Sequence, residues 1–471
     1  MNTVSLTYLI FTTGLWLVVC GIASPKVKRT ALLLASYFFY ATFGLGFLAI
    51  LIASSLLNFC LARFIARKPI ASRLWVGILA NVLILFLFKY VPGTIMLSMA
   101  MLHSRSWLSQ LAWPAGISFW TFQAISSLFD NYREPVAVTL QEFCLYMAFW
   151  PTVISGPICR LREMLPQFRM SYRPTWSDVS LGVRRIIIGL FMKVFLAQLL
   201  ANGFLPGQGL DSGFKQQAKL GGCDVWVLAI GFGFQLFFDF AGYSNIAIGV
   251  ARVFGIKLRE NFDDPYMAAS PSIFWTRWHM SLSFWIRDYV FLPLATLRRG
   301  DSWRLFVIFF SMLIFGIWHG ATLGFLFWGS YQGLLLVLHR LLQLANKRWK
   351  LYSASNVFTL LGWAATFATI CLGWISFRQT SFWAALRMYQ AVFSPKTYFD
   401  FNLDPNLYLE VLIMFLGYLS VEFMRRVARE IEPRPAWRTT RWLLSPMFYS
   451  ALILAIVIWS QGNAAFIYFQ F

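Results

Sequence analysis

Residues 309–320 read FFSMLIFGIWHG, an apolar run that carries a single histidine, His319, one residue before its end. Another apolar run starts shortly after Gly320. Together, residues 304–343 are long enough for two helices that each cross a bilayer, because one crossing needs about 17 to 25 residues. The stretch therefore predicts a pair of membrane helices with an ionisable side chain where the first one ends.

Apolar runs of this kind recur along the whole chain. They occupy residues 3–24, 30–43, 45–65, 75–92, 111–129, 224–255, 304–343, 355–376, 406–424 and 443–461. We expect two elements in 224–255 and in 304–343, and re-entrant or interfacial helices in the more polar stretches 141–158, 178–203 and 265–297. The sequence predicts an all-α polytopic membrane protein with roughly ten to thirteen membrane and re-entrant helices, folded as a single domain over residues 1–471.

The composition excludes a soluble globular protein. Of the 471 residues, 59% are hydrophobic and only 13% are charged, and the chain contains 21 Trp and 48 Phe. A soluble chain of this length exposes too much surface to hide so many apolar side chains. Lipid as the surrounding solvent removes that difficulty.

The net charge of +21 does not indicate a nucleic-acid partner. The basic residues gather in short turns between apolar runs, namely Lys26–Arg29, Arg63–Arg73, Lys347–Lys350 and Arg425–Arg441. This distribution is typical of cytosolic loops and places the N-terminus outside. Some of these cations would also attract an anionic cytosolic donor such as a coenzyme thioester.

Several familiar site chemistries are missing from the sequence. The six cysteines are scattered without metal-ligand or redox spacing, so we expect small core residues and no metal site. No zinc pattern, phosphate loop, dinucleotide glycine pattern or nucleophile-elbow serine is present. Acyl transfer from an activated thioester needs none of these. It needs a base near a hydroxyl, donors for the developing oxyanion, and exclusion of water.

His319 is the first candidate for such a base. A helix from Leu305 to Trp318 rises about 21 Å from a basic cytosolic turn, against a hydrocarbon core of about 30 Å. The imidazole should therefore lie inside the membrane thickness. Gly316 and Gly320 leave room for a backbone bend or a ligand. Ionisable groups at this depth are either functional or paired internally, so the alternative is a packing histidine bonded to a neighbouring helix.

A second candidate site lies in residues 274–289, which read FWTRWHMSLSFWIRDY. Its polar and aromatic candidates are Arg277, Trp278, His279, Arg287, Asp288 and Tyr289. Helical spacing predicts one shared face for Trp275, His279 and Ser283. An interfacial anchor would explain the tryptophans and arginines, but not the histidine and the aspartate as well. We therefore expect a helix that lines a polar cavity.

Asp239 is a third intramembrane ion, and Gly242, Tyr243 and Ser244 follow it closely. These neighbours are expected to break the helix and to supply hydrogen bonds. A structural ion pair between Asp239 and Arg277 or Arg287 is an alternative to a catalytic role. The two other histidines, His103 and His339, are expected to be ordinary surface or interfacial groups.

Several short motifs occur together in one order along the chain. They are PAGISF at 114–119, SGPICR at 155–160, FDFAGYS at 238–244, ENF at 260–262 with PY at 265–266, RWHMSL at 277–282, RDY at 287–289, WHG at 318–320 and FIYFQF at 466–471. In this ordered set the chain resembles the membrane-bound O-acyltransferase family, in the bacterial branch that contains alginate O-acetyltransferases and the D-alanyl transfer proteins of teichoic acid modification.

The resemblance implies a ring of membrane helices around a central funnel. It implies that His319 is the catalytic residue and that His279 is a second polar group nearby. It further implies a multi-pass protein of the bacterial inner membrane that binds no cofactor and takes its acyl group from acetyl-CoA or an acyl-carrier thioester. A periplasmic esterase-like acyltransferase would be the partner, and an exported cell-surface polysaccharide the acceptor.

The chain departs from this resemblance in ways that bear on the substrate. Residues 292–298 read LPLATLR, where acetylating members commonly carry Gly-Gly-Asn-Arg. Further along the chain, Gln332–Gly333 occupies a position at which His-Gly is frequent in the family. The stretch 278–285 is closer to the D-alanyl branch and 160–163 to the acetylating one. We expect acetyl transfer, with D-alanyl transfer as the alternative.

The sequence and the resemblance together predict a role for each candidate residue. His319 would be a general base or transient acyl acceptor, and His279 would position donor or acceptor. Residues assigned to substrate binding and to holding the cavity are Trp278, Trp318, Arg277, Arg287, Asp288, Tyr289, Asp239 and Ser244. The competing classes are a transporter or export scaffold that makes no bond, and a structural assembly partner in which neither histidine matters.

Overall fold

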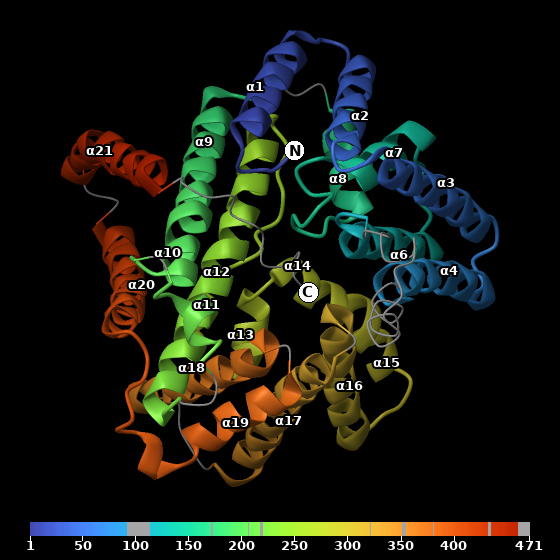
Figure 1. Ribbon diagram of the computed structural model, residues 1–471. Helices are drawn as coiled ribbons and strands as arrows, with labels where there is room; N and C mark the ends of the chain where they lie inside the picture. Colours follow the sequence, from blue (N-terminus) through green and yellow to red (C-terminus); the bar gives the residue numbers. More distant parts are fainter. Residues whose placement is uncertain are drawn as a thin grey trace, which may run out of the picture. The chain divides into compact units, whose positions relative to one another are not determined.

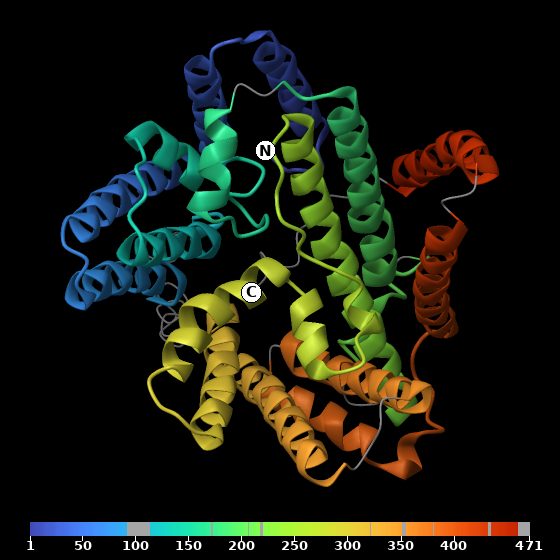
Figure 2. The same cartoon turned by 180° about the vertical axis from the view of Figure 1, so that it is seen from behind.

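The structure is a computed structural model that describes residues 1–91, 114–170, 173–205, 207–216, 220–320, 322–350, 355–379, 381–431 and 435–459. Within these ranges all regular secondary structure is helical (Figures 1 and 2). The prediction of an all-α protein is therefore confirmed. His103 and the C-terminal motif at 466–471 lie outside the described residues.

Six described helices are long and apolar enough to cross a membrane. They are Leu45–Arg67, Ala71–Lys89, Gly222–Val253, Asp301–His319, Asn356–Arg378 and, within a longer helix, Pro405–Arg425. Two shorter apolar segments, Leu6–Gly21 and Leu444–Trp459, accompany them. The chain is thus a polytopic membrane protein. The single domain, the ring and the funnel stay predictions.

The described chain divides into two compact units. The first comprises residues 1–186 and 244–260. Its helices are α1 (Leu6–Gly21), α2 (Pro25–Ala41), α3 (Leu45–Arg67), α4 (Ala71–Lys89), α6 (Ile117–Arg133), α7 (Leu140–Ala148), α8 (Leu161–Arg169) and most of α9 (Trp176–Leu190).

Within the first unit, α3 and α4 both pack on α6. Ala62, Ile65, Leu74 and Leu128 form the apolar core of that contact. Nearby, the buried amides of Asn58 and Asn81 donate hydrogen bonds to each other at 3.0 and 2.7 Å. A reciprocal amide pair satisfies polar groups that lipid could not hydrogen-bond, and so it fixes the register of α3 against α4.

The second unit comprises residues 187–243 and 261–471. Its helices are α10 (Ala197–Asn202), α11 (Leu210–Gly213), most of α12 (Gly222–Val253), α13 (Pro271–Arg277), α14 (Met280–Ile286), α15 (Leu292–Ala295), α16 (Asp301–His319), α17 (Leu323–Trp349), α18 (Asn356–Arg378), α19 (Phe382–Val392), α20 (Pro405–Ile431) and α21 (Pro435–Trp459). Two π-helical turns, η2 (Phe191–Leu196) and η5 (Arg287–Phe291), and the 3₁₀ turns η4 (Pro265–Met267) and η6 (Pro395–Thr397) complete it.

Helices α16 and α17 form a tightly packed antiparallel pair, which confirms two elements in residues 304–343. Two glycines make the approach close. A Cβ atom on Gly316 would lie 2.5 Å from the carbonyl oxygen of Phe325 and 2.8 Å from the Cα atom of Gly329. Only glycine allows the backbones to meet here. The crossing therefore holds the end of α16, and His319 with it, against α17.

The prediction of two elements in 224–255 is wrong, because α12 is one continuous helix of 32 residues. Gly242 does not break it. A Cβ atom there would lie 2.8 Å from the carbonyl oxygen of Gly189, so Gly242 serves a close helix contact instead. Helix α12 therefore continues through Gly242 without a break.

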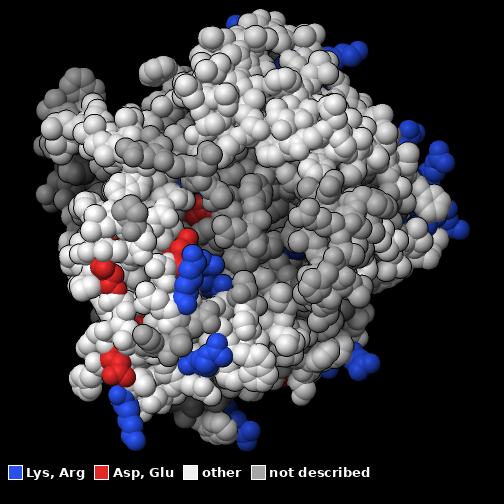
Figure 3. Space-filling model, in the orientation of Figure 1, with Lys and Arg blue, Asp and Glu red and all other residues white. Residues whose placement is uncertain are grey.

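The exposed surface is consistent with a lipid environment. In the view of Figure 3 most of the described surface carries no charged side chain, and the Lys and Arg side chains form separate small groups. Large apolar side chains such as Leu45 and Trp75 are 76% and 59% exposed. Isolated exposed apolar residues are normal, but this many along whole helices require an apolar surrounding.

Candidate active site

His319 is the last residue of α16 and is only 3% exposed. Among the described residues, five aromatic rings enclose its imidazole, with centroids at 4.6 Å (Trp318), 4.9 Å (Phe377), 5.1 Å (Phe315), 5.2 Å (Trp328) and 5.8 Å (Phe325). These rings come from α16, α17 and α18. Three helices thus build an enclosure of low polarity, in which any electrostatic interaction of the imidazole is stronger than in water.

His279 lies between α13 and α14, and its backbone is left-handed, with φ 43° and ψ 53°. The prediction that Trp275, His279 and Ser283 share one helical face is therefore wrong, because the helix ends at Arg277 and restarts at Met280. A left-handed residue that is not glycine is held in place by its surroundings. The break turns the imidazole into the interior, where it is fully buried.

Asn261 is the residue that holds His279 and the start of α14. Its Oδ1 accepts hydrogen bonds from the backbone N–H and the hydroxyl of Ser281, at 3.2 and 2.9 Å, and lies 3.0 Å from His279 Nδ1. Its carbonyl oxygen accepts the Met280 N–H at 2.8 Å. Since a backbone N–H can only donate, the amide oxygen faces this side. His279 Nδ1 must then carry the proton, and Nε2 holds the ring's lone pair.

Burial lowers the pKa of His279 to about 3. The residue lies in a segment outside the six candidate spans. Desolvation disfavours the imidazolium, so the ring is neutral at physiological pH. A neutral ring with a defined tautomer presents Nε2 as an acceptor of a proton or of a hydrogen bond.

The two histidines belong to one aromatic cluster of the second unit. Trp278, next to His279, contacts Trp374 at a centroid distance of 5.0 Å, and Trp374 contacts Phe377 at 5.6 Å. Phe377 is one of the rings around His319. Two motifs that are 40 residues apart in the sequence are therefore joined through α18, which carries Trp374 and Phe377.

Asp239 forms an ion pair with Lys193, and both side chains are 1% exposed. The alternative of a structural ion pair is therefore right in kind but wrong in partner, because Lys193 takes the place expected for Arg277 or Arg287. Lys193 lies in the π-helical turn η2, whose extra residue changes the direction of the side chains on this stretch. The next residue in α12, Phe240, contacts the His279 ring at 4.5 Å. The ion pair thus anchors the helix that carries one wall of the His279 site.

Of the remaining predicted residues, Arg277, Arg287, Asp288 and Tyr289 lie in less enclosed positions, whereas Ser244 is buried. Arg287 pairs with Asp288 at 2.8 Å, and 53% of its side chain is exposed. The Tyr289 ring contacts Trp285 at 5.3 Å. Arg277 contributes its carbonyl oxygen, which accepts the Asp263 N–H at 3.0 Å. Ser244 is buried in the part of α12 that belongs to the first unit.

A cavity of about 310 Å³ lies beside this cluster in the second unit. Its lining residues are Ser272, Trp275, Thr276, Ser283, Phe284, Ile286, Arg287, Phe291, Ile308, Ser311, Met312, Phe315, Leu336 and Arg340. The lining is mainly apolar, with hydroxyl groups and two arginines, Arg287 and Arg340. Phe315 belongs both to this lining and to the enclosure of His319. The cavity and the histidine thus share a wall.

Sequence reasoning missed several residues that build this site. Asn261 and Lys193 receive no partner role in the sequence-based prediction, which assigns Trp328 and Trp374 only to apolar runs and leaves Phe377 just beyond the run 355–376. The sequence held a signal for Asn261, which stands within the ENF motif at 260–262. It held a weaker one for Lys193, a lone cation in an otherwise apolar stretch.

Comparison with known proteins agrees with the resemblance that the sequence motifs indicate. The family model of the membrane-bound O-acyltransferases matches residues 131–375. A probable alginate O-acetylase of Pseudomonas putida is 31% identical over 96% of both chains. A peptidoglycan O-acetyltransferase of Helicobacter pylori is 29% identical over 94% of this chain and 85% of its own. A teichoic acid D-alanyltransferase of Bacillus subtilis is 29% identical over 57% of this chain and 69% of its own.

Proposed function

Because this chain belongs to the membrane-bound O-acyltransferase family and is an acyltransferase, we propose that it passes an acetyl group from a cytosolic thioester toward an exported polysaccharide. Relatives whose names state acetylation of alginate and of peptidoglycan match this chain almost from end to end, which supports acetyl as the acyl group. The bacterial inner membrane is the compartment in which a cytosolic donor and an exported acceptor are both within reach.

The enclosure of His319 carries this proposal. In it, the imidazole takes the proton of the acceptor hydroxyl as the oxygen attacks the thioester carbonyl. The new C–O bond forms, the C–S bond breaks, and the proton passes to the leaving thiolate. The five surrounding rings keep water away from the thioester, which would otherwise be hydrolysed.

The cavity that shares Phe315 with His319 is suited to the thioester donor. Its apolar lining fits the uncharged arm of such a donor, and Arg287 and Arg340 fit its phosphate groups. In this role Arg287 keeps the substrate-binding assignment made from the sequence. Asp288 holds the Arg287 guanidinium in place through their ion pair.

His279 is assigned the positioning of a substrate group through Nε2. Asn261 fixes its tautomer and the left-handed backbone fixes its direction. A neutral acceptor at this point orients a hydroxyl without adding a charge to the buried interior of the second unit.

The decisive experiment is single-turnover acyl transfer with the purified full-length protein, radiolabelled acetyl-CoA and a polysaccharide that supplies the acceptor hydroxyl groups. We expect His319→Ala to lower thiol release by about 100-fold or more, since general bases contribute about 10²- to 10⁴-fold. His339→Gln is the matched control. It also removes a histidine, from the neighbouring helix α17, and glutamine can still hydrogen-bond the Ser272 hydroxyl. Unchanged thiol release in His319→Ala would refute the assignment, and an intact thioester with the wild-type protein would favour a transporter or scaffold.

D-alanyl transfer is the second candidate, and similarity to teichoic acid D-alanyltransferases favours it. The same assay with a D-alanyl carrier-protein thioester separates the two. We also propose a periplasmic esterase-like partner that completes the transfer, which co-purification from membranes of the native organism would detect.

A further inference from the structure

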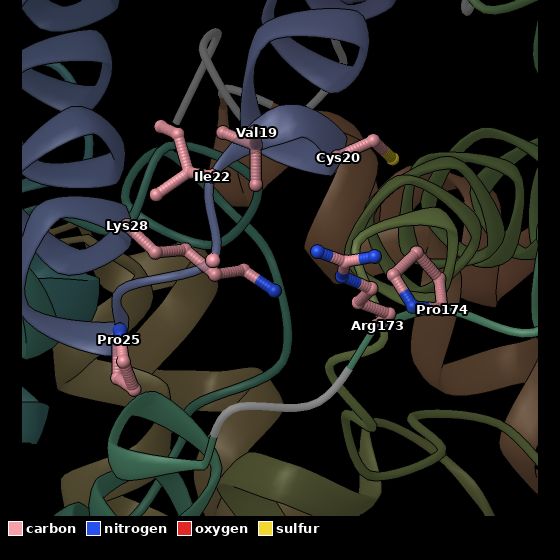
Figure 4. Close-up of a pocket in the computed structure, with 8 residues that line it drawn as sticks. Val19, Cys20, Ile22, Pro25, Lys28, Arg173 and Pro174 are labelled. Atoms are coloured by element: carbon pink, nitrogen blue, oxygen red, sulfur yellow. The ribbon is translucent and has the colours of Figure 1, made fainter.

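The first unit contains a second cavity, of about 200 Å³, between the turn that joins α1 to α2 and the segment before α9 (Figure 4). Its lining residues are Val19, Cys20, Ile22, Ala23, Pro25, Lys28, Arg173 and Pro174. Figure 4 shows the Lys28 ammonium and the Arg173 guanidinium directed into the same space from opposite sides. Among the described residues that line the cavity, none is acidic.

The local electrostatics favour an anion in this cavity. Lys28 lies in the first turn of α2, which contains no acidic residue, and Ser24 supplies no side-chain cap to the helix N-terminus. A helix N-terminus carries a partial positive charge, so cations are unfavourable there and anions are favourable. The Lys28 ammonium and the Arg173 guanidinium therefore both add positive potential to one space, at the positive end of α2.

We propose that this cavity binds the phosphate of an anionic phospholipid headgroup. An ammonium and a guanidinium are donors from which phosphate oxygens accept charge-assisted hydrogen bonds. A volume of about 200 Å³ holds a headgroup and leaves the acyl chains outside, since pockets for drug-sized ligands begin at roughly 300 Å³.

The surroundings of the cavity select a lipid over a soluble phosphate. Leu17, Val18 and Val27, on the helices that frame the turn, are 62%, 60% and 52% exposed. Such side chains offer an apolar path for acyl chains directly beside the two cations. The basic turn at 26–29 is expected on the cytosolic side, where anionic lipids attract Lys and Arg.

The test is native mass spectrometry of the full-length protein in detergent, titrated with phosphatidylglycerol or with phosphatidylcholine of the same acyl chains. We expect phosphatidylglycerol to bind the wild type more tightly than phosphatidylcholine does. We expect roughly five- to tenfold weaker binding for Lys28→Gln and for Arg173→Gln, and a larger loss for the double variant. Lys26→Gln is the matched control, because it removes the same charge from the same turn but does not line the cavity.

Two further arms make the outcome decisive. Thermal unfolding of each variant without lipid shows whether it folds, so that lost binding is not misread as lost structure. Inorganic phosphate, added to the lipid-free protein, measures binding of the free anion. Equal phosphatidylglycerol binding by the wild type and the double variant would overturn the site. Stabilisation by inorganic phosphate equal to that by phosphatidylglycerol would overturn the lipid as its occupant.

Discussion

Asn261 determines what His279 can do. One side-chain oxygen accepts from Ser281 and faces His279 Nδ1, so a single residue fixes both the backbone break and the imidazole tautomer. Neither effect can be obtained from local propensity, because the break depends on an asparagine 18 residues earlier in the chain. The consequence is a histidine whose acceptor atom has a defined direction.

The first prediction concerns Asn261→Ala. Removal of the acceptor leaves buried donors of His279 and Ser281 unsatisfied, which costs about 1 to 3 kcal/mol each. We expect a lower melting temperature and a loss of kcat beyond that explained by unfolding, because His279 is no longer held. Asn58→Ala is the control, since it breaks a buried amide pair in the first unit and should lower stability alone. An Asn261→Ala enzyme with wild-type kcat would contradict the positioning role.

The second prediction concerns pH. Burial holds the pKa of His279 at about 3 in the folded protein, below its ordinary value of 6.5. Between pH 6.5 and about pH 3 the unfolded chain therefore carries a proton on His279 that the folded protein lacks. The free energy of unfolding falls as the pH drops through this range. The contribution is at most about 1.4 kcal/mol per pH unit.

Thermal unfolding in nanodiscs between pH 7 and pH 4 measures this dependence. His279→Gln should give a flatter curve than the wild type, because glutamine does not titrate. The same slope in both proteins would show that another group is responsible.

Close backbone contact defines the α16–α17 pair. The sequence predicts both helices from their apolar length, but it does not show that Gly316 and Gly329 face each other. That contact sets how far α16 can approach α17 and thereby where its last residue, His319, lies. Glycine in a membrane helix thus serves packing here, as it does at Gly242 in α12.

The third prediction concerns Gly316→Ala. The added methyl group would lie 2.5 Å from the Phe325 carbonyl oxygen, so the helices must separate. We expect a loss of roughly 1 to 3 kcal/mol of stability and reduced thiol release, because His319 moves within its enclosure. Gly417→Ala in α20 is the control, since its Cβ atom meets nothing within 4 Å. Unaltered activity in Gly316→Ala would show that the crossing does not position His319.

The whole chain carries an asymmetric charge. Its basic residues concentrate in turns such as 26–29 and 347–350, which the positive-inside rule assigns to the cytosol. By that rule the asymmetry sets the orientation of the protein in the membrane. The anionic thioester proposed as the donor would then be attracted to the side that carries these basic turns.

The last prediction is that the donor reacts from one side only. In proteoliposomes of known orientation, acetyl-CoA on the face that carries residues 347–350 should release its thiol, and acetyl-CoA confined to the other face should not. Protease accessibility of that loop reports the orientation of each preparation. Equal reaction from both faces would contradict a cytosolic donor.

The sequence alone determined the class of protein and most helix positions. Membrane spans follow from local composition, because lipid requires each helix to be apolar over its own length and to satisfy its own backbone. It also singled out His319, since an ionisable group in an apolar run is conspicuous wherever the chain later places it, and His279, since it stands in a short stretch that mixes aromatic and charged residues.

Only the tertiary structure decided how these residues are held and what surrounds them. The pairing of Lys193 with Asp239, the hold of Asn261 on His279, and the path from Trp278 through Trp374 to Phe377 all join residues that are distant in sequence. Apolar residues look alike in a membrane sequence whether they face lipid or a partner helix. Which of them enclose His319 therefore depends on helix packing, which the periodicity of a single helix does not encode.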